Sequence, residues 1–260
     1  MILPTVQLIR RLALGCALLL IVGCTTQTGP EIRVDEAVSS RVAAGMQYLQ
    51  QGEPSEARRH LSRALDLNDR SAMAHNAMAL LYNYEDDPER EEHHYRRALR
   101  ADRNYAPALN NYATLLYSRG EYRRALEMFT RAANDPSYEG RGSAWFNIGR
   151  CHLRLDDAEQ AHHAFTRSIR LNPGASQPNL ELAALDFAAG RTSRSWGYFQ
   201  QYTQRGGVQT PRSLWLGIRI ADALDLQDQQ SSFELALANR FSHSPEHRQW
   251  QDWKTAKEQH

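Results

Sequence analysis

The most informative segment of the sequence for the fold is Gly142–Ala175, which reads GSAWFNIGRCHLRLDDAEQAHHAFTRSIRLNPGA. Apolar and small side chains recur in it three or four residues apart, as in Trp145, Ile148 and Gly149 and again in Ala161 and Phe165. That spacing places them on one face of each of two successive helices. Asn172-Pro173 ends the second helix, because proline cannot continue it. The stretch therefore predicts a pair of antiparallel helices.

The same pattern recurs along most of the chain. A column of small residues has spacings of 34, 34, 36, 34 and 34: Gly45, Ala79, Ala113, Gly149, Ala183 and Gly217. Twelve residues after each stand Ala57, Glu91, Ala125, Ala161, Ser195 and Gln229. Sixteen residues after each stand Leu61, Tyr95, Phe129, Phe165, Phe199 and Phe233. Small side chains let two helices approach closely, and the rings fill the groove between successive pairs. Such pairs must stack to bury their apolar faces.

This period and these columns resemble the tetratricopeptide repeat (TPR). We therefore expect an all-α TPR superhelix of about six helix-turn-helix repeats, over 38–243, with a C-terminal capping helix in 244–260. The repeats are placed at 38–71, 72–105, 106–139, 142–175, 176–209 and 210–243. Gly140 and Arg141 are inserted between the third and fourth repeats, so the register is expected to kink there and to leave two blocks of three.

The N-terminal segment has a different character. Arg10 and Arg11 precede the apolar run Leu12–Val22, which ends at Gly23-Cys24. The run is about 11 residues, whereas a bilayer-spanning helix needs roughly 20, so it favours a signal peptide. Its end resembles a bacterial lipobox, which implies that 1–23 is a lipoprotein signal peptide and that Cys24 receives lipid. An ordinary signal peptide with a chance cysteine is the alternative. Residues 24–37 are expected to be a flexible tether.

Composition and motifs exclude several classes of function. Lys plus Arg is 31 and Asp plus Glu is 30, which argues against a strongly basic nucleic-acid binder. The chain has no Gly-rich phosphate loop, zincin motif or CxxC pair. Adjacent histidines, such as His93-His94 and His162-His163, point about 100° apart on a helix and suit a metal poorly. We expect no enzyme activity, metal, cofactor or small-molecule substrate; an enzyme using Cys151 or a histidine cluster is the rival hypothesis.

A TPR array binds other proteins, and the first helix of each repeat lines its concave surface. Positions three before and one after the small column are expected to face this groove and contact a partner: Val42, Met46, Asn76, Leu80, Asn110, Thr114, Phe146 and Arg150. The early positions are mostly apolar and the middle ones polar. The pattern suits an extended or helical peptide with apolar anchors. The side chains of Met46 and Leu80 are expected to face solvent in the free protein.

Three further segments make the resemblance more specific. They are Leu109-Asn110-Asn111-Tyr112 with the irregular turn Asp135–Tyr138, the pair Gly206-Gly207, and Arg212–Arg219, which contains Ser213, Leu216 and Gly217. With the lipobox, they make the chain similar to the pilotin-like lipoproteins of type IV pilus biogenesis, the PilF/PilW type. Ala113 departs from the family's usual glycine after Tyr112.

That resemblance implies a function and a location. The family helps the outer-membrane secretin of the type IV pilus to reach the membrane and to multimerise into its ring. Thr25 stands where an Asp would signal retention in the inner membrane, so we expect a lipid anchor in the outer membrane, facing the periplasm. The alternative is a general periplasmic TPR scaffold for cell-envelope or cell-wall enzymes.

Overall fold

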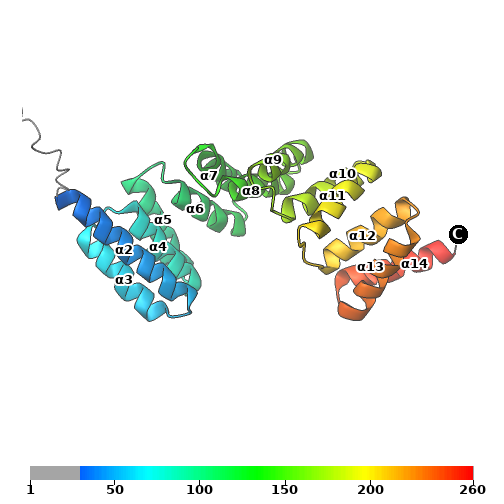
Figure 1. Ribbon diagram of the computed structural model, residues 1–260, viewed down its shortest axis with the longest axis horizontal. Helices are drawn as coiled ribbons and strands as arrows, with labels where there is room; N and C mark the ends of the chain where they lie inside the picture. The colour runs from blue at the N-terminus through cyan, green and yellow to red at the C-terminus, as the bar shows by residue number, and fades with distance from the viewer. Residues whose placement is uncertain (1–29, 260) are drawn as a thin grey trace, which may run out of the picture.

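A computed structural model of the protein describes residues 30–259, which form helices joined by short turns (Figure 1). The helices are α2 (Pro30–Gln50), α3 (Pro54–Leu67), α4 (Ala72–Tyr84), α5 (Pro88–Ala101), α6 (Ala106–Ser118), α7 (Tyr122–Asn134), α8 (Arg141–Arg154), α9 (Ala158–Leu171), α10 (Gln177–Ala188), α11 (Thr192–Gln204), α12 (Pro211–Ala223), α13 (Gln227–Arg240) and α14 (Pro245–Glu258). Six antiparallel pairs are followed by one further helix. The predicted all-α TPR superhelix is confirmed.

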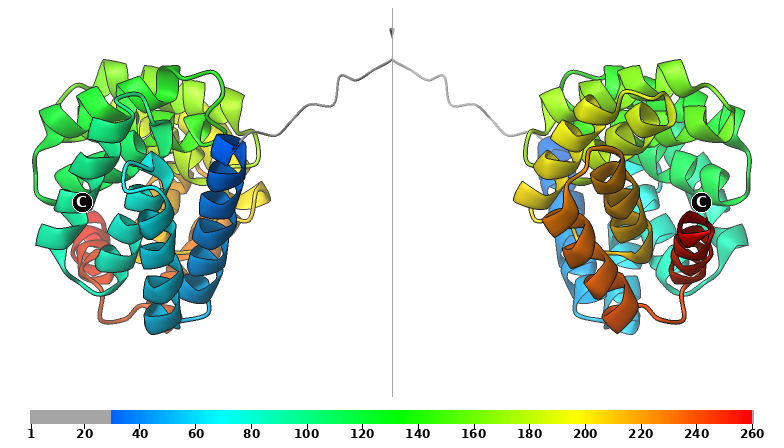
Figure 2. Two further views of the ribbon diagram at one scale, coloured as in Figure 1. Left: turned by 90° about the vertical axis from the view of Figure 1, so that its left-hand side faces the viewer. Right: turned by 90° about the vertical axis from the view of Figure 1, so that its right-hand side faces the viewer.

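The helix pairs follow one another along the long axis of the molecule and wrap around a common axis when seen from either end (Figures 1 and 2). First helices of neighbouring repeats are in contact in four cases: α2 with α4, α4 with α6, α6 with α8, and α10 with α12. Second helices of the described repeats do not approach one another as closely. The first helices therefore line the inner side of the superhelix, as a TPR array requires.

Close approach of the two helices in a repeat explains the column of small residues. A Cβ atom on Gly149 would lie 2.5 Å from the Phe165 ring, and one on Gly45 would lie 2.7 Å from Leu61. Ala125 and Ala161, in the second small column, are completely buried. The columns found in the sequence are thus the contact surface between the helices, packed without room for one more carbon.

The expected division into two blocks of three repeats is wrong. One continuous core cluster runs from Ala79 in α4 to Ala164 in α9, and Tyr138 in the irregular turn packs against it. The turn itself is ordered by side chains: Asp135 accepts hydrogen bonds from Ser137, and the Arg141 Nε donates to the Ala133 carbonyl at 3.1 Å. Of the two inserted residues, Gly140 lies at the end of the turn and Arg141 begins α8, while the core continues beneath the turn.

The expected tether is also shorter than the sequence suggested, because α2 already begins at Pro30. Val34, Val38 and Val42 are four residues apart, so they form one stripe on this helix. Val38 and Val42 are buried in the core of the first repeat, and Val34 packs against it. This stripe makes residues 33–37 part of the folded array. The predicted signal peptide and Cys24 lie outside the described residues. Between residues 30 and 259, no helix has both the length and the apolar character that a membrane crossing demands.

Candidate functional site

The structure distributes the eight predicted contact residues unevenly. Val42 is only 7% exposed and packs in the core, so its expected place in the groove is wrong. The cause is the valine stripe of α2, which turns this position towards α3 and α4. Asn76 is also buried. Met46 packs against the same core as Val42 and is partly exposed, in part contrary to the expectation that it faces solvent.

The other five predicted residues reach the inner surface to different degrees. Thr114 is exposed, whereas Leu80, Asn110, Phe146 and Arg150 are half-buried. The Phe146 ring lies 5.6 Å from the Phe165 ring, so it contributes to the core of the fourth repeat. The Arg150 guanidinium lies 4.4 Å from the centre of the Tyr117 ring. The predicted row of contacts is therefore an alternation of packed and accessible side chains.

A pocket between α4 and α6 collects three residues that the sequence analysis singled out. Leu80, Asn111 and Thr114 line it, and its volume is about 190 Å³. The remaining walls are Asn83, Glu91, Tyr95, Leu115 and Ser118. Its sides come from two first helices, and α5 supplies Glu91 and Tyr95. It is thus a hollow in the inner surface with one apolar wall and several hydrogen-bonding groups.

Three asparagines beside this pocket form a chain of amides. The Asn111 Nδ2 donates to the Asn76 Oδ1 at 3.1 Å, and the Asn110 Nδ2 donates to the Asn111 Oδ1 at 3.3 Å. The Asn110 Oδ1 is buried and has no hydrogen-bond partner among residues 33–259. Buried acceptors are usually satisfied, so this oxygen is an exception in the packing of the amide chain. The motif Asn110-Asn111 therefore lies on the inner surface beside the predicted groove.

Glu91 is the residue of this pocket that sequence reasoning missed. Its side chain is 3% exposed although it carries a carboxyl group. Burial raises the pKa of Glu91, while hydrogen bonds from Asn83 and Tyr95 oppose the shift. The signal was present in the sequence, because Glu91 is the charged member of a column that is small in most repeats.

The other motif residues shape the scaffold. A Cβ atom on Gly207 would lie 2.4 Å from the Tyr202 ring, and one on Gly217 would lie 2.8 Å from the Phe199 ring. Gly206 adopts a φ of 72°, which favours glycine. Leu216 is buried, 3% exposed, in the core of repeats five and six.

Polar motif residues connect helices or end them. The Arg212 guanidinium donates two hydrogen bonds of 2.7 Å to Glu181, which joins α12 to α10. Ser213 and Thr210 form a capping box at the start of α12. The Tyr112 hydroxyl donates to Glu92 at 2.8 Å and joins α6 to α5.

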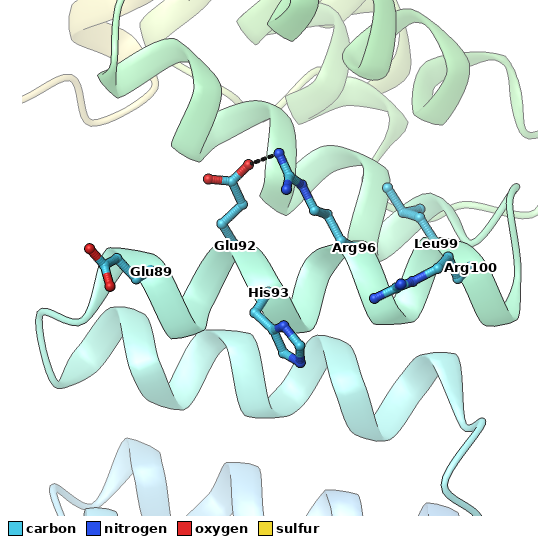
Figure 3. A pocket seen from close by; sticks show the side chains of 6 residues that line it. All are labelled: Glu89, Glu92, His93, Arg96, Leu99 and Arg100. Carbon is cyan, nitrogen blue, oxygen red and sulfur yellow. Dashed lines mark ion pairs between the residues drawn. The ribbon is translucent and has the colours of Figure 1, made fainter.

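A larger hollow of about 550 Å³ lies along α5 and is lined by that helix alone (Figure 3). Glu92 and Arg96 point towards each other there and form an ion pair of 2.6 Å. Because one helix supplies the whole lining, we regard this surface as the outer face of the second repeat and not as the binding site.

Cys151 and the histidine pairs, which were the candidates for a catalytic or metal site, lie against other residues of the fold. Burial raises the pKa of the Cys151 thiol to about 12, so little thiolate forms at neutral pH. The Nδ1 atoms of His94 and His75 are 3.0 Å apart. His162 lies 3.5 Å from the Asp186 carboxylate. Over residues 33–259, side chains of the kinds that bind metals do not gather in threes.

Comparison with known proteins agrees with this architecture. The tetratricopeptide repeat profile matches residues 42–106, 86–139 and 142–175. The type IV pilus assembly protein PilF of Pseudomonas aeruginosa is 33% identical over 217 residues, which cover 84% of this chain and 86% of that protein.

Solved structures extend the likeness to three dimensions. A structure of Pseudomonas aeruginosa PilF superposes with a TM-score of 0.81 at 33% identity, covering 84% of this chain and 98% of PilF. The crystal structure of PilW, described as a widely conserved type IV pilus biogenesis factor, superposes with a TM-score of 0.70 at 25% identity, covering 82% and 97%. The chain therefore belongs to the PilF/PilW family of tetratricopeptide-repeat proteins of type IV pilus biogenesis.

Proposed function

We propose that the protein is an outer-membrane lipoprotein, anchored through Cys24 and facing the periplasm, that binds the type IV pilus secretin and assists its localisation and multimerisation. Membership of the PilF/PilW family supports the pilus assignment. The charged, short apolar and Gly23-Cys24 layout at the N-terminus supports the anchor. The protein acts as a scaffold without catalysis.

The observation that carries the binding role is the pocket between α4 and α6. It offers the apolar Leu80, the hydroxyl of Thr114 and the amide of Asn111 on one inner surface. A peptide segment needs this combination, because an apolar anchor supplies affinity and hydrogen-bonding groups align the main chain. Met46 adds partly exposed apolar surface on the neighbouring first helix.

Leu80→Glu tests the site directly. A carboxylate at the apolar wall would be desolvated against the partner, so secretin binding should weaken by about 1–3 kcal/mol. Met46→Glu should act in the same direction. Leu235→Glu is the matched control, because Leu235 is 63% exposed on α13. The measurement is co-purification of the secretin from detergent-solubilised envelopes, together with a thermal melt of each variant.

The result separates four cases. Loss of the secretin with an unchanged melt supports the site, whereas normal retention by both inner-surface variants places the contact elsewhere. A collapsed melt would show that Leu80 is a core residue. Recovery of cell-wall enzymes without the secretin would favour the general periplasmic scaffold.

A further inference from the structure

Three arginines on the first helices of the C-terminal repeats share an unusual environment. Arg150 and Arg154 lie on α8, and Arg219 lies on α12. Each guanidinium stacks on an aromatic ring of the preceding repeat: Arg150 on Tyr117 at 4.4 Å, Arg154 on Tyr122 at 4.6 Å, and Arg219 on Phe187 at 5.1 Å. Stacking holds a guanidinium in place and leaves its hydrogen-bonding edge available.

Helices α8, α10 and α12 offer no free carboxylate to the three stacked arginines. Helix α8 has none, and those of α10 and α12 are Glu181, Asp186 and Asp222. Glu181 pairs with Arg212, Asp186 with Arg191 and Arg194, and Asp222 with Lys257. Within residues 33–259, none of the three stacked arginines forms an ion pair. Helices α8 and α12 therefore carry positive charge that the carboxylates of these first helices do not neutralise.

Arg219 is the most constrained of the three. Its guanidinium also lies 5.2 Å from the Trp215 ring, and its Nε is buried without a hydrogen-bond acceptor in the described part of the chain. Burial lowers the pKa of this guanidinium below its usual value. Arginine is rarely buried without a partner, because desolvating an unpaired charge costs free energy. An arriving carboxylate would offset that cost through short, charge-assisted hydrogen bonds.

The positions between the arginines that correspond to Arg150 and Arg154 carry short side chains. Arg150 and Arg154 stand one and five residues after the small column in repeat four, and Ala184 and Ala188 hold the same positions in repeat five. Two positive points, on α8 and on α12, are thus separated by a helix whose side chains are short at these two positions. A single terminal carboxylate could not reach both points, whereas a segment with several acidic side chains could.

We propose that the inner surface of repeats four to six binds an extended acidic segment of a protein partner through Arg150, Arg154 and Arg219. This surface is separate from the pocket of repeats two and three. The proposal concerns a second binding surface, and it can be correct whether or not the secretin binds to the pocket between α4 and α6.

The test uses the purified full-length protein in neutral detergent and a fluorescent peptide of alternating Glu and Ala, acetylated and amidated. The comparison peptide has Gln in place of Glu. Anisotropy should show at least tenfold tighter binding of the Glu peptide at low salt, and the difference should shrink at high salt. Arg219→Met and the double variant Arg150→Met, Arg154→Met should each weaken binding of the Glu peptide about tenfold or more.

The controls separate binding from folding. Arg123→Met, on the exposed surface of α7, should bind the peptide as the unaltered protein does. Arg219→Met should melt at the same or a higher temperature, because it removes an unpaired, desolvated charge. Where that variant does not fold, Arg219→Lys keeps the charge and loses the planar fork, and it should also bind more weakly.

Four results would overturn the proposal. They are equal binding of the Gln and Glu peptides, unchanged binding by the arginine variants, binding only of a Gln-Ala peptide with a free C-terminus, and binding of phosphatidylglycerol vesicles but not of the Glu peptide. The third result would assign the surface to a chain terminus and the fourth to a lipid surface. The secretin takes no part in this experiment, so the two proposals are tested apart.

Discussion

Glu91 occupies a position that the 34-residue period mostly gives to a small side chain. Its carboxyl group replaces an alanine at a helix contact and adjoins the inner pocket. A structural role alone would be served by alanine, as at Ala125 and Ala161, which are completely buried. We therefore interpret Glu91 as a polar group retained for the pocket at a cost to stability.

Glu91→Gln should raise the melting temperature at pH 7. Burial raises the pKa of Glu91 above its ordinary value of 4.5, so the folded state favours the protonated form. Stability is then lost as pH rises through the folded pKa, and glutamine removes that loss. The advantage of the variant should disappear at about pH 4 and below. Melts across this range should show the convergence; Glu89→Gln, exposed on the same helix, should show no such dependence. A constant difference at every pH would contradict the assignment.

Ala161→Leu should destabilise the array by about 1–3 kcal/mol through overpacking. Ala161 is completely buried in a cluster with Phe165 and Leu182. Ala125→Leu should behave alike. Arg123→Leu on the exposed face of α7 should cost far less. Chemical denaturation measures the free energy of unfolding for each, and equal losses at the buried and exposed positions would mean that the helix register is wrong.

At the scale of elements, α14 covers the apolar face that the last repeat would otherwise expose. Trp250 and Trp253 of this helix pack on the cluster of Leu214, Ile218 and Leu237. The Trp253 ring lies 5.7 Å from the Trp215 ring in an edge-to-face arrangement. Lys257 pairs with Asp222 on α12 at 2.5 Å. The terminal helix thus takes the place of the next first helix in the stack.

Trp253→Ala should lower the free energy of unfolding by about 2 kcal/mol, less than for a completely buried tryptophan. The loss should be greatest in α12 and α13, because these helices contact the cap. Hydrogen exchange can locate it. Asp252→Ala, on an exposed position of the same helix, is the control and should leave protection of α12 unchanged. Uniform loss of protection from α2 onward would contradict a local capping role.

At the scale of the whole molecule, the array begins close to its proposed anchor. Helix α2 starts at Pro30, so only residues 25–29 separate it from Cys24. Even fully extended, six residue steps span only about 20 Å. Lipidation would therefore hold the first repeats near the membrane, while the C-terminal repeats extend away along the long axis of the superhelix (Figure 1).

Cys24→Ala should release the protein from the membrane or mislocalise it, and leave its melt unchanged. Acyl chains contribute about 0.8 kcal/mol per buried CH₂, so several chains make dissociation very slow. Membrane fractionation and mass spectrometry of the mature N-terminus check this. An unmodified N-terminus at another residue would disprove the lipid anchor.

The helix pairs, their number and their order can be predicted from the amino-acid sequence alone. The reason is physical: contact between neighbouring helices demands small residues and rings at a constant spacing, and that spacing is visible in one dimension. The resemblance to the family was also visible in the sequence. Its glycines Gly207 and Gly217 lie where a Cβ atom would clash with a neighbouring ring, so glycine is required there.

The accessibility of individual side chains, in contrast, depends on contacts between elements that are distant in the sequence. Val42 and Leu80 were both predicted to face the groove. Val42 is instead buried with the valine stripe of α2, whereas Leu80 lines a pocket formed with α6. The pairing of the carboxylates on α10 and α12 was equally hidden, because partners such as Glu181 and Arg212 are 31 residues apart. Helix spacing is a local property of the chain, whereas burial and charge pairing depend on how successive repeats superpose around the common axis.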